Sequence, residues 1–188
     1  MSKIAIVYHS GYGHTAILAD SVAKGVNSVA GASAHIIKAE DADKHWDDLA
    51  AADGIIFGAP TYMGSLSAPF KAFMDASSKV WMQQSWKDKI AAGFTNSASQ
   101  SGDKLNSLIQ LAIFAAQHGM IWVNLGLLPG NNASTASPND LNRLGSFLGA
   151  MAQSNNDQGP DLAPPEADRK TAEHLGRRVA EIAARMKK

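Results

Sequence analysis

Short apolar runs alternate with amphipathic helical patterns along this chain, and this alternation constrains the fold more than any other feature of the sequence. The runs are rich in aliphatic residues and are closed by Gly, Pro or polar residues, as buried strands are. They span residues 3–7, 34–38, 54–58, 89–95 and 120–125. Strands that alternate with helices form βαβ units, so the sequence predicts a parallel sheet with helices on both faces.

The helical patterns lie between and after these runs. Leu18, Val22 and Val26, for example, recur on one face of a helix. Helices are predicted over residues 15–29, 44–52, 103–117 and 166–186, and from Pro69 onward. The polar, Pro-containing stretch 152–168 is expected to be a surface excursion, because too little chain follows it to form another domain. We therefore expect a single domain over residues 1–188.

The number of predicted strands narrows the choice among α/β folds. Five strands in this length suit a flavodoxin-like three-layer sandwich, with a five-stranded parallel sheet, better than the six-stranded dinucleotide-binding fold. Both folds bind ligands at the carboxyl ends of the strands, where the strand order reverses. The loops expected to form a site are therefore residues 10–15, 60–67 and 95–102.

Composition excludes several classes of function. Lys plus Arg and Asp plus Glu both number 17, and the resulting formal net charge of zero argues against a nucleic-acid-binding surface. The chain has no cysteine, so thiolate catalysis and Cys-ligated metal or iron–sulfur centres are ruled out. No apolar run approaches the roughly 20 residues of a membrane span, and the N-terminal run is too short for a signal peptide. A cytoplasmic location is expected.

The first loop, Ser10-Gly11-Tyr12-Gly13-His14-Thr15, has the composition of an anion site. Its glycines let the backbone approach a ligand closely, and its two hydroxyls lie beside the free N–H groups of a helix N-terminus. Although the loop contains no Lys or Arg, this combination of amides and hydroxyls suits the binding of a terminal phosphomonoester. A plain strand-to-helix turn remains the alternative for this loop.

A dinucleotide fingerprint also fits this segment formally. Gly11-x-Gly13-x-x-Ala16 matches the pattern, and Glu40 is a loose candidate for its acidic residue. Tyr12 and His14 are bulky where a pyrophosphate must lie on the backbone, so this match is the weaker interpretation.

Two further loops follow the third and fourth predicted strands. Pro60-Thr61-Tyr62-Met63-Gly64-Ser65 combines a fixed turn, an aromatic ring and a thioether, which suits a flat heteroaromatic ring. Thr95-Asn96-Ser97-Ala98-Ser99 begins a polar loop that ends at Gly102. Each loop alone could be an ordinary surface loop. Three such loops at one sheet edge form a more specific constellation, and we predict that these residues bind a cofactor.

The three loops together resemble the flavodoxin-like NAD(P)H:quinone oxidoreductases, the WrbA family. The matching motifs are the phosphate loop at Ser10, Tyr12, Gly13 and His14, the second loop at Pro60, Thr61 and Gly64, the segment His118-Gly119-Met120, and Trp81. The resemblance implies that FMN is the cofactor, that the first loop holds its phosphate, and that NADH or NADPH is the electron donor. It runs from residue 3 to about residue 125.

The sequence departs from the family pattern in three places. Tyr62-Met63 replaces Arg-Phe, the third loop lacks a glycine cluster, and the insertion between the second and third strands is missing. The first two departures bear on substrate and nicotinamide preference, and all three bear on the family's tetramer.

The main functional expectation is an FMN-dependent oxidoreductase that transfers two electrons from NAD(P)H to a quinone or similar small-molecule acceptor. By resemblance, His118 is a candidate catalytic donor to a quinone oxygen. The other interpretation of His118 is a cation favoured at a helix C-terminus. Trp81 is the one tryptophan with a resemblance argument for the pocket rim. A homo-oligomer, dimer or tetramer, is expected, with no nucleic-acid or membrane partner.

Two other classes of function remain open. One is a flavodoxin-type electron carrier. The net charge of zero argues against this function, because electrostatic steering to basic partner proteins needs an excess of acidic residues. The other is a binding module that kept the fold and lost the flavin. No metal is expected, because His9, His35, His45 and His174 show no metal-ligand spacing with one another or with carboxylates.

Overall fold

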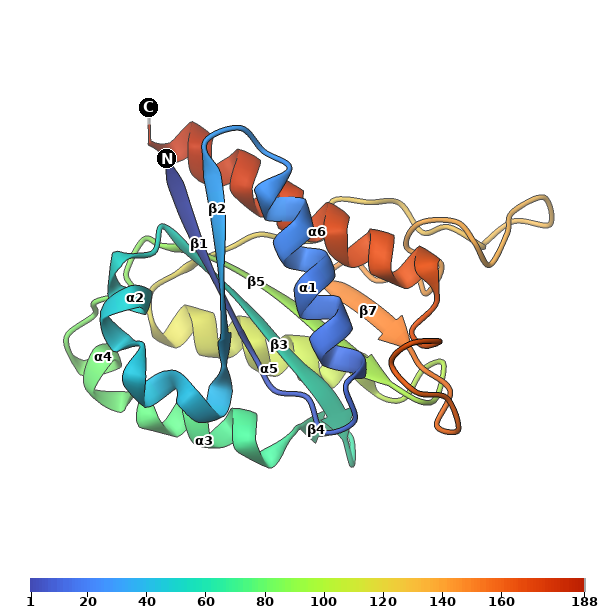
Figure 1. Ribbon diagram of the computed structural model, residues 1–188, viewed down its shortest axis with the longest axis horizontal. Helices are drawn as coiled ribbons and strands as arrows, with labels where there is room; N and C mark the ends of the chain where they lie inside the picture. The colour runs from blue at the N-terminus through green and yellow to red at the C-terminus, as the bar shows by residue number, and fades with distance from the viewer. Residues whose placement is uncertain (188) are drawn as a thin grey trace.

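The computed structural model describes residues 1–187 and has at its centre a twisted parallel sheet with the strand order β2-β1-β3-β5-β6 (Figure 1). These strands are β1 (Ser2–Tyr8), β2 (Ala32–Lys38), β3 (Gly54–Tyr62), β5 (Ile90–Ser97) and β6 (Ile121–Trp122). Two further strands complete the sheet: β4 (Ser65–Leu66) forms a hairpin with β3, and β7 (Ala150–Gln153) pairs with β5. The predicted flavodoxin-like α/β fold is confirmed.

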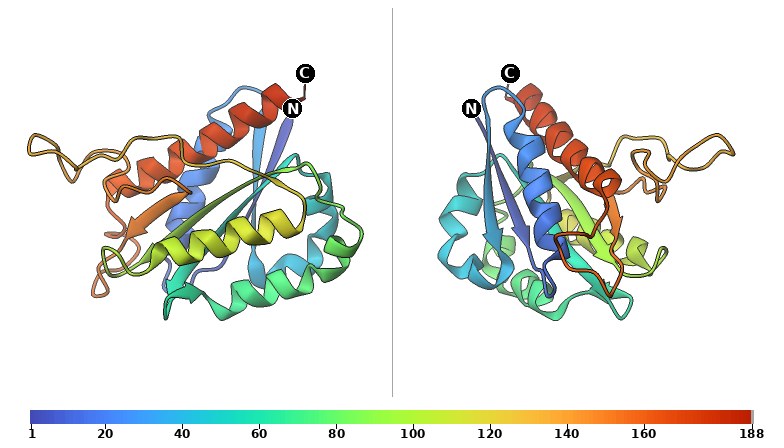
Figure 2. Two further views of the ribbon diagram at one scale, coloured as in Figure 1. Left: turned by 180° about the vertical axis from the view of Figure 1, so that it is seen from behind. Right: turned by 45° about the vertical axis from the view of Figure 1, so that its right-hand side comes forward.

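Helices cover both faces of this sheet (Figure 2). On one face, α1 (His14–Asn27) and α6 (Glu166–Met186) pack over a core that includes Ile6, Val22 and Leu175. The opposite face carries the 3-10 helix η1 (Ala39–Lys44) and the helices α2 (Trp46–Ala51), α3 (Ala68–Ala76), α4 (Ser78–Met82) and α5 (Lys104–Gln117). Its core contains the rings of Phe57, Phe73 and Trp86. The two cores make the three layers of the sandwich.

Helices α1 and α6 touch at the level of their backbones. A Cβ atom added to Gly25 would lie 1.8 Å from the carbonyl oxygen of Glu173, and one added to Gly176 would lie 2.0 Å from that of Val22. No side chain fits at either position without moving a helix. Glycine at these two positions therefore sets how closely the helices approach.

The sequence predicts one strand over residues 120–125, but the edge of the sheet beside β5 is formed by two short strands, β6 and β7. Only Ile121 and Trp122 pair there, with Ile90 and Ala91, and the chain then leaves the sheet. It returns as β7, which pairs with residues 94–97 of β5, further along the same edge. The intervening residues 123–149 form an excursion, part of which projects from the body of the molecule (Figures 1 and 2). One edge position is thus shared by two short strands.

This excursion is tied back to the fold by a buried ion pair. The Arg143 guanidinium donates to both carboxylate oxygens of Asp168 at 2.7 Å, and both side chains are less than a tenth exposed. Asp168 also accepts the backbone N–H of Gln153, the last residue of β7, at 2.9 Å. Because Asp168 lies in the first turn of α6, one carboxylate links the excursion, β7 and α6.

Within residues 1–187, no helix is both long enough and apolar enough to cross a membrane.

Candidate flavin site

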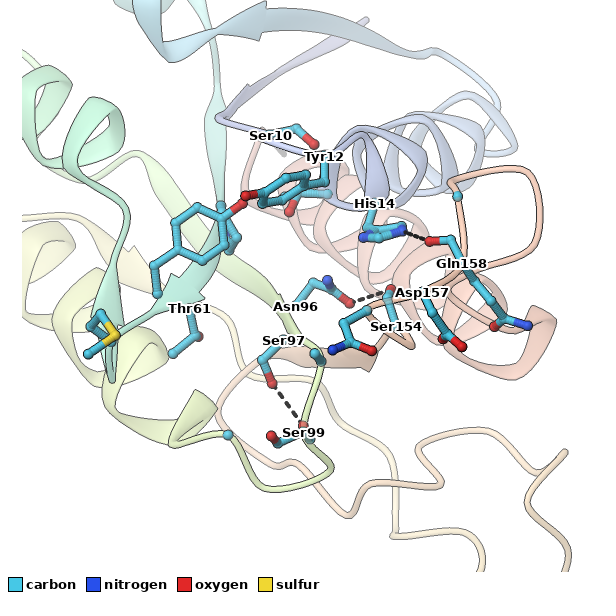
Figure 3. A pocket seen from close by; sticks show the side chains of 18 of the residues that line it. Ser10, Tyr12, His14, Thr61, Asn96, Ser97, Ser99, Ser154, Asp157 and Gln158 are labelled. Atoms are coloured by element: carbon cyan, nitrogen blue, oxygen red, sulfur yellow. Dashed lines mark hydrogen bonds between the residues drawn. The ribbon is translucent and has the colours of Figure 1, made fainter.

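A cavity of about 950 Å³ lies at the carboxyl ends of β1, β3 and β5, and four loops enclose it (Figure 3). All three predicted loops contribute. The predicted residues that line it are Ser10, Tyr12, His14, Thr15, Pro60, Thr61, Tyr62, Met63, Gly64, Asn96, Ser97, Ala98 and Ser99. Four other predicted residues, Gly11, Gly13, Ser65 and Thr95, lie in the same loops but do not line the cavity. The parallel sheet therefore brings together segments almost 90 residues apart in the sequence.

The first loop presents a cradle of N–H groups and hydroxyls. Helix α1 begins at His14, directly after Gly13, whose φ of 89° is the left-handed conformation that glycine adopts without strain. The first N–H groups of a helix have no acceptor within it, so those of His14 and Thr15 at the start of α1 are available to bind an anion. Ser10 Oγ accepts the N–H of Ala16 at 3.2 Å, which fixes the hydroxyl at the edge of the cradle.

This cradle contains no cation. Among the described residues 1–187 that line the cavity, Asp157 is the one with a charged side chain, and none is Lys or Arg. Any anion held there is therefore held by backbone dipoles and hydroxyl groups, as at other helix N-termini.

The second loop supplies an aromatic wall. Strand β3 runs on to Tyr62, and the turn to β4 places Met63 at φ 50° and Gly64 at φ 76°. The Tyr62 ring meets that of Tyr12 edge to face, with centroids 6.3 Å apart, and a Cβ atom added to Gly11 would lie 2.6 Å from the Tyr62 hydroxyl. Burial raises the pKa of Tyr62, and Tyr12 raises it further. The side chain of Met63 is fully exposed at the tip of the turn.

The floor of the cavity is a buried hydroxyl network. Thr61 Oγ1 lies 2.8 Å from the hydroxyls of both Thr95 and Ser107. Asn96 Oδ1 accepts the Ser154 hydroxyl at 2.9 Å. Thr95 therefore supports the floor from below rather than facing the cavity.

A buried lysine anchors the third loop. The Lys104 ammonium, on a side chain that is almost wholly buried, donates to Ser97 Oγ at 2.7 Å and to the carbonyl oxygens of Ser99 and Gln100 at 2.8 Å. Burial lowers its pKa to about 8, because desolvation disfavours the charged form. Loop residues 97–100 are thus held from inside the protein by a side chain that does not line the cavity.

The sequence predicts residues 152–168 only as a surface excursion, but part of this segment forms a fourth loop of the site. Ser154, Asn156, Asp157, Gln158 and Gly159 all line the cavity. His14 Nε2 lies 2.8 Å from the Gln158 carbonyl oxygen, which joins this loop to the first one (Figure 3). The available signal was a polar cluster directly after the apolar residues that form β7.

The structure corrects the prediction for His118. This residue follows α5, at the end of the helix remote from the third loop, and does not line the cavity. It is 1% exposed, its Nε2 lies 2.9 Å from the Ser77 hydroxyl, and its ring packs 4.4 Å from that of Trp86. Desolvation lowers its pKa to about 4. His118 is therefore a neutral core residue, and Trp81 is likewise absent from the cavity lining.

Residues 29–134, more than half of the chain, match the family model described as NADPH-dependent FMN reductase. The chain is also 46% identical to "Flavodoxin FldP" of Pseudomonas aeruginosa, over 97% of each protein. The chain belongs to this family of flavodoxin-like flavoproteins.

Other members of the family are more distant in sequence. The chain is 33% identical to an "NAD(P)H dehydrogenase (quinone)" of Geobacter sulfurreducens, over 98% of each protein. It is 30% identical to the "Quinone-oxidoreductase QR2" of Triphysaria versicolor, over 99% of this chain and 97% of the relative. The recognised resemblance to quinone oxidoreductases is thus confirmed at the level of the family.

A solved structure with a sequence identity close to that of FldP has the same fold. The crystal structure of a flavodoxin, WrbA-like protein from Agrobacterium tumefaciens superposes with a TM-score of 0.76 at 43% identity, covering 98% of this chain and 99% of that one. A flavodoxin from the domain Archaea, 21% identical, superposes with a TM-score of 0.67 and shows the fold alone. These two structures therefore align with almost all of this chain, 98% and 97% of it.

Proposed function

We propose that this protein binds FMN in the four-loop cavity and serves as a flavodoxin-type electron carrier. The observation that carries the proposal is the cation-free cradle of residues 10–15, which lies beside the aromatic wall of Tyr12 and Tyr62 in one cavity. Such a site suits a ligand with one terminal phosphate and one flat ring system. The bound flavin would supply the redox chemistry at its isoalloxazine ring.

The residues of the cavity fit the parts of FMN. The N–H groups at the start of α1, with the Ser10 and Thr15 hydroxyls, would hold the phosphate. The tyrosine pair and the third loop, anchored by Lys104, would flank the ring, and the polar fourth loop would close over the chain between them. The cavity volume of about 950 Å³ lies at the upper end of the range for small-molecule sites.

Two observations favour a carrier over a reductase that uses NAD(P)H. In the part of the chain that the structure describes, no Lys or Arg lines the cavity to meet the additional phosphates of a nicotinamide dinucleotide. The alignment with "Flavodoxin FldP" spans 186 residues, whereas that with the G. sulfurreducens quinone dehydrogenase spans 206, more than the 188 residues of this chain. The G. sulfurreducens quinone dehydrogenase therefore carries segments that this chain lacks.

A net charge of zero does not exclude an electron carrier, because a redox partner meets the local charge around the cavity rather than the total charge of the molecule. Asp103, Asp157 and Asp161 are exposed acids in the third and fourth loops. Lys104, which follows the third loop at the start of α5, is buried and adds no charge to this surface. These three exposed acids outnumber Arg169, whose guanidinium donates to the carbonyl oxygens of Pro160 and Asp161 in the fourth loop. This local excess of acid favours approach of a basic redox partner.

A quinone reductase is the second candidate, and the family model together with the quinone dehydrogenases at about 30% identity favours it. The two functions separate in one assay. FMN-loaded protein is mixed with NADH or NADPH, with and without benzoquinone, and nicotinamide oxidation is followed at 340 nm. A carrier gives no turnover above free FMN, although dithionite reduces its flavin. Saturable, quinone-dependent turnover would replace the carrier proposal with the reductase.

A further inference from the structure

Three metal-binding side chains meet on the surface away from the flavin cavity. His35 lies on β2, His45 directly precedes α2, and Asp48 lies in the first turn of α2. One ligand atom of each lies within 4.8 Å of those of the other two. We propose that His35, His45 and Asp48 bind a divalent transition-metal ion of the Zn²⁺ class. None of the three lines the cavity, so this site is separate from the proposed FMN site.

The sheet and the helix bring these residues together from different elements. Side chains alternate along a strand, and Ile37 of β2 packs into the core beneath η1, α2 and α3. His35 lies two residues before Ile37 and therefore faces the same side of the sheet. The connection through η1 returns His45 and Asp48 to this side. A spacing of ten residues across a strand, a 3-10 helix and a helix start explains why no metal motif is visible in the sequence.

The distances suit coordination by small movements of exposed side chains. Asp48 Oδ2 lies 2.8 Å from His45 Nδ1 and 3.8 Å from His35 Nδ1. In a tetrahedral Zn²⁺ site with bonds of about 2.0–2.1 Å, neighbouring ligand atoms are roughly 3.3 Å apart. The two observed distances bracket that value. The imidazole rings already meet edge to face, with centroids 5.4 Å apart.

The chemistry of the ligands selects the class of ion. Two imidazoles with one carboxylate suit Zn²⁺, Ni²⁺ or Cu²⁺ better than Mg²⁺ or Ca²⁺, which prefer oxygen ligands. The surrounding segment is acidic: of residues 40–48, five carry a carboxylate and one, Lys44, carries an amine. This excess raises the local concentration of cations. Each side chain is between about a third and a half exposed, so an ion can reach the site from solvent.

A metal ion at this site would join the edge strand to the rest of the fold. Strand β2 pairs only with β1 in the described structure, so its other edge is free. An edge strand held by one neighbour is among the weaker parts of a sheet. Coordination by His35 on the strand and by His45 and Asp48 before and within α2 would therefore stabilise β2.

The test uses the full chain after treatment with a chelator and gel filtration. Zn²⁺ is titrated by calorimetry, and Co²⁺ is titrated with its visible absorption bands as a direct report on coordination. Wild type is compared with His45→Gln and His35→Gln. Asp41→Asn is the matched control, because Asp41 is an exposed carboxylate in the same segment that pairs with Lys44.

We expect wild type and Asp41→Asn to bind one Zn²⁺ per chain and to show Co²⁺ bands. Each histidine variant should bind about tenfold more weakly or worse and lose the bands. Zn²⁺ should also raise the unfolding temperature of wild type, with no rise for His45→Gln. Equal Zn²⁺ binding by wild type and both histidine variants, or no Co²⁺ bands in wild type, would overturn the proposal. FMN uptake by each variant reports that it is folded, independently of the metal.

Discussion

At the scale of single residues, the flavin site depends on a few hydroxyl and N–H groups placed at the start of α1. Ser10 and Thr15 could be proposed as ligands from the sequence because they flank glycines at a strand-to-helix junction. The role of Lys104 could not, since its side chain acts from within the protein on backbone atoms of a loop. His118 was misassigned because resemblance carries a residue type but not its burial. In this chain the ring is enclosed by Trp86 and Phe114.

Replacing Ser10 or Thr15 with Ala is expected to weaken FMN binding. Each hydroxyl would donate to a charged phosphate, a bond worth about 1.5–3 kcal/mol, so affinity should fall about tenfold or more per substitution. Quenching of FMN fluorescence on titration measures the dissociation constant. Ser21→Ala is the control, because the Ser21 hydroxyl bonds to the Ile17 carbonyl within α1 and does not line the cavity. An unchanged FMN affinity in both Ser10→Ala and Thr15→Ala would show that these hydroxyls do not bind the phosphate.

Lys104→Met is expected to loosen the third loop and lower FMN affinity severalfold. The substitution leaves the Ser97 hydroxyl and the carbonyls of Ser99 and Gln100 without their shared donor. Lys170→Met, on the exposed face of α6, should bind FMN as wild type does. The same fluorescence titration measures both, and limited proteolysis reports whether cleavage appears in the loop. A variant that is resistant to protease and binds FMN normally would contradict the anchoring role.

The burial of His118 predicts a specific dependence of stability on pH. Its pKa is about 4 in the folded protein and 6.5 when unperturbed, so between these values the unfolded chain binds more protons. The free energy of unfolding should therefore fall as pH drops from 6.5 to 4. In His118→Gln this decrease should be shallower, while FMN affinity at pH 7 stays unchanged. Urea unfolding at several pH values measures the slopes, and parallel slopes would show that His118 does not titrate as described.

At the scale of elements, the main strands and helices were predicted because hydrophobic periodicity decides them, whereas η1, β4 and α4 were not, and β3 runs four residues beyond its predicted end at residue 58. The long helices α5 and α6 match the predicted ranges within a residue. The last strand could not be predicted in full. Its two halves, β6 and β7, are separated by residues 123–149, and only pairing with β5 reveals that they occupy one position. The fourth cavity loop was missed for the same reason, since it follows β7.

The contact of α1 with α6 is the element-level feature most sensitive to substitution. Gly176→Ala should lower the free energy of unfolding by about 1–3 kcal/mol, because its Cβ would overlap the Val22 carbonyl and force the helices apart. Glu181→Ala, on the exposed face of α6, should change it by less than about 0.5 kcal/mol. Chemical denaturation measures both. Equal stabilities for the two variants would show that the helices can separate without cost.

At the scale of the whole molecule, fold and family could be inferred from sequence, whereas the choice between carrier and reductase could not. That choice depends on where charge lies rather than on how much there is. The total is zero, yet the cavity lining formed by residues 1–187 has no Lys or Arg, and the third and fourth loops expose acids. Net charge describes solubility and long-range behaviour, and the local surface describes which partner can dock.

The central claim is that a cation-free cradle at the end of β1 holds the phosphate of a flavin mononucleotide. Titration of the purified chain with FMN and with riboflavin, which shares the ring and lacks the phosphate, tests it most directly. Two or three bonds to a charged group predict that one FMN binds per chain, about a hundredfold or more tightly than riboflavin. Equal affinity for the two flavins, or binding of neither, would contradict the account.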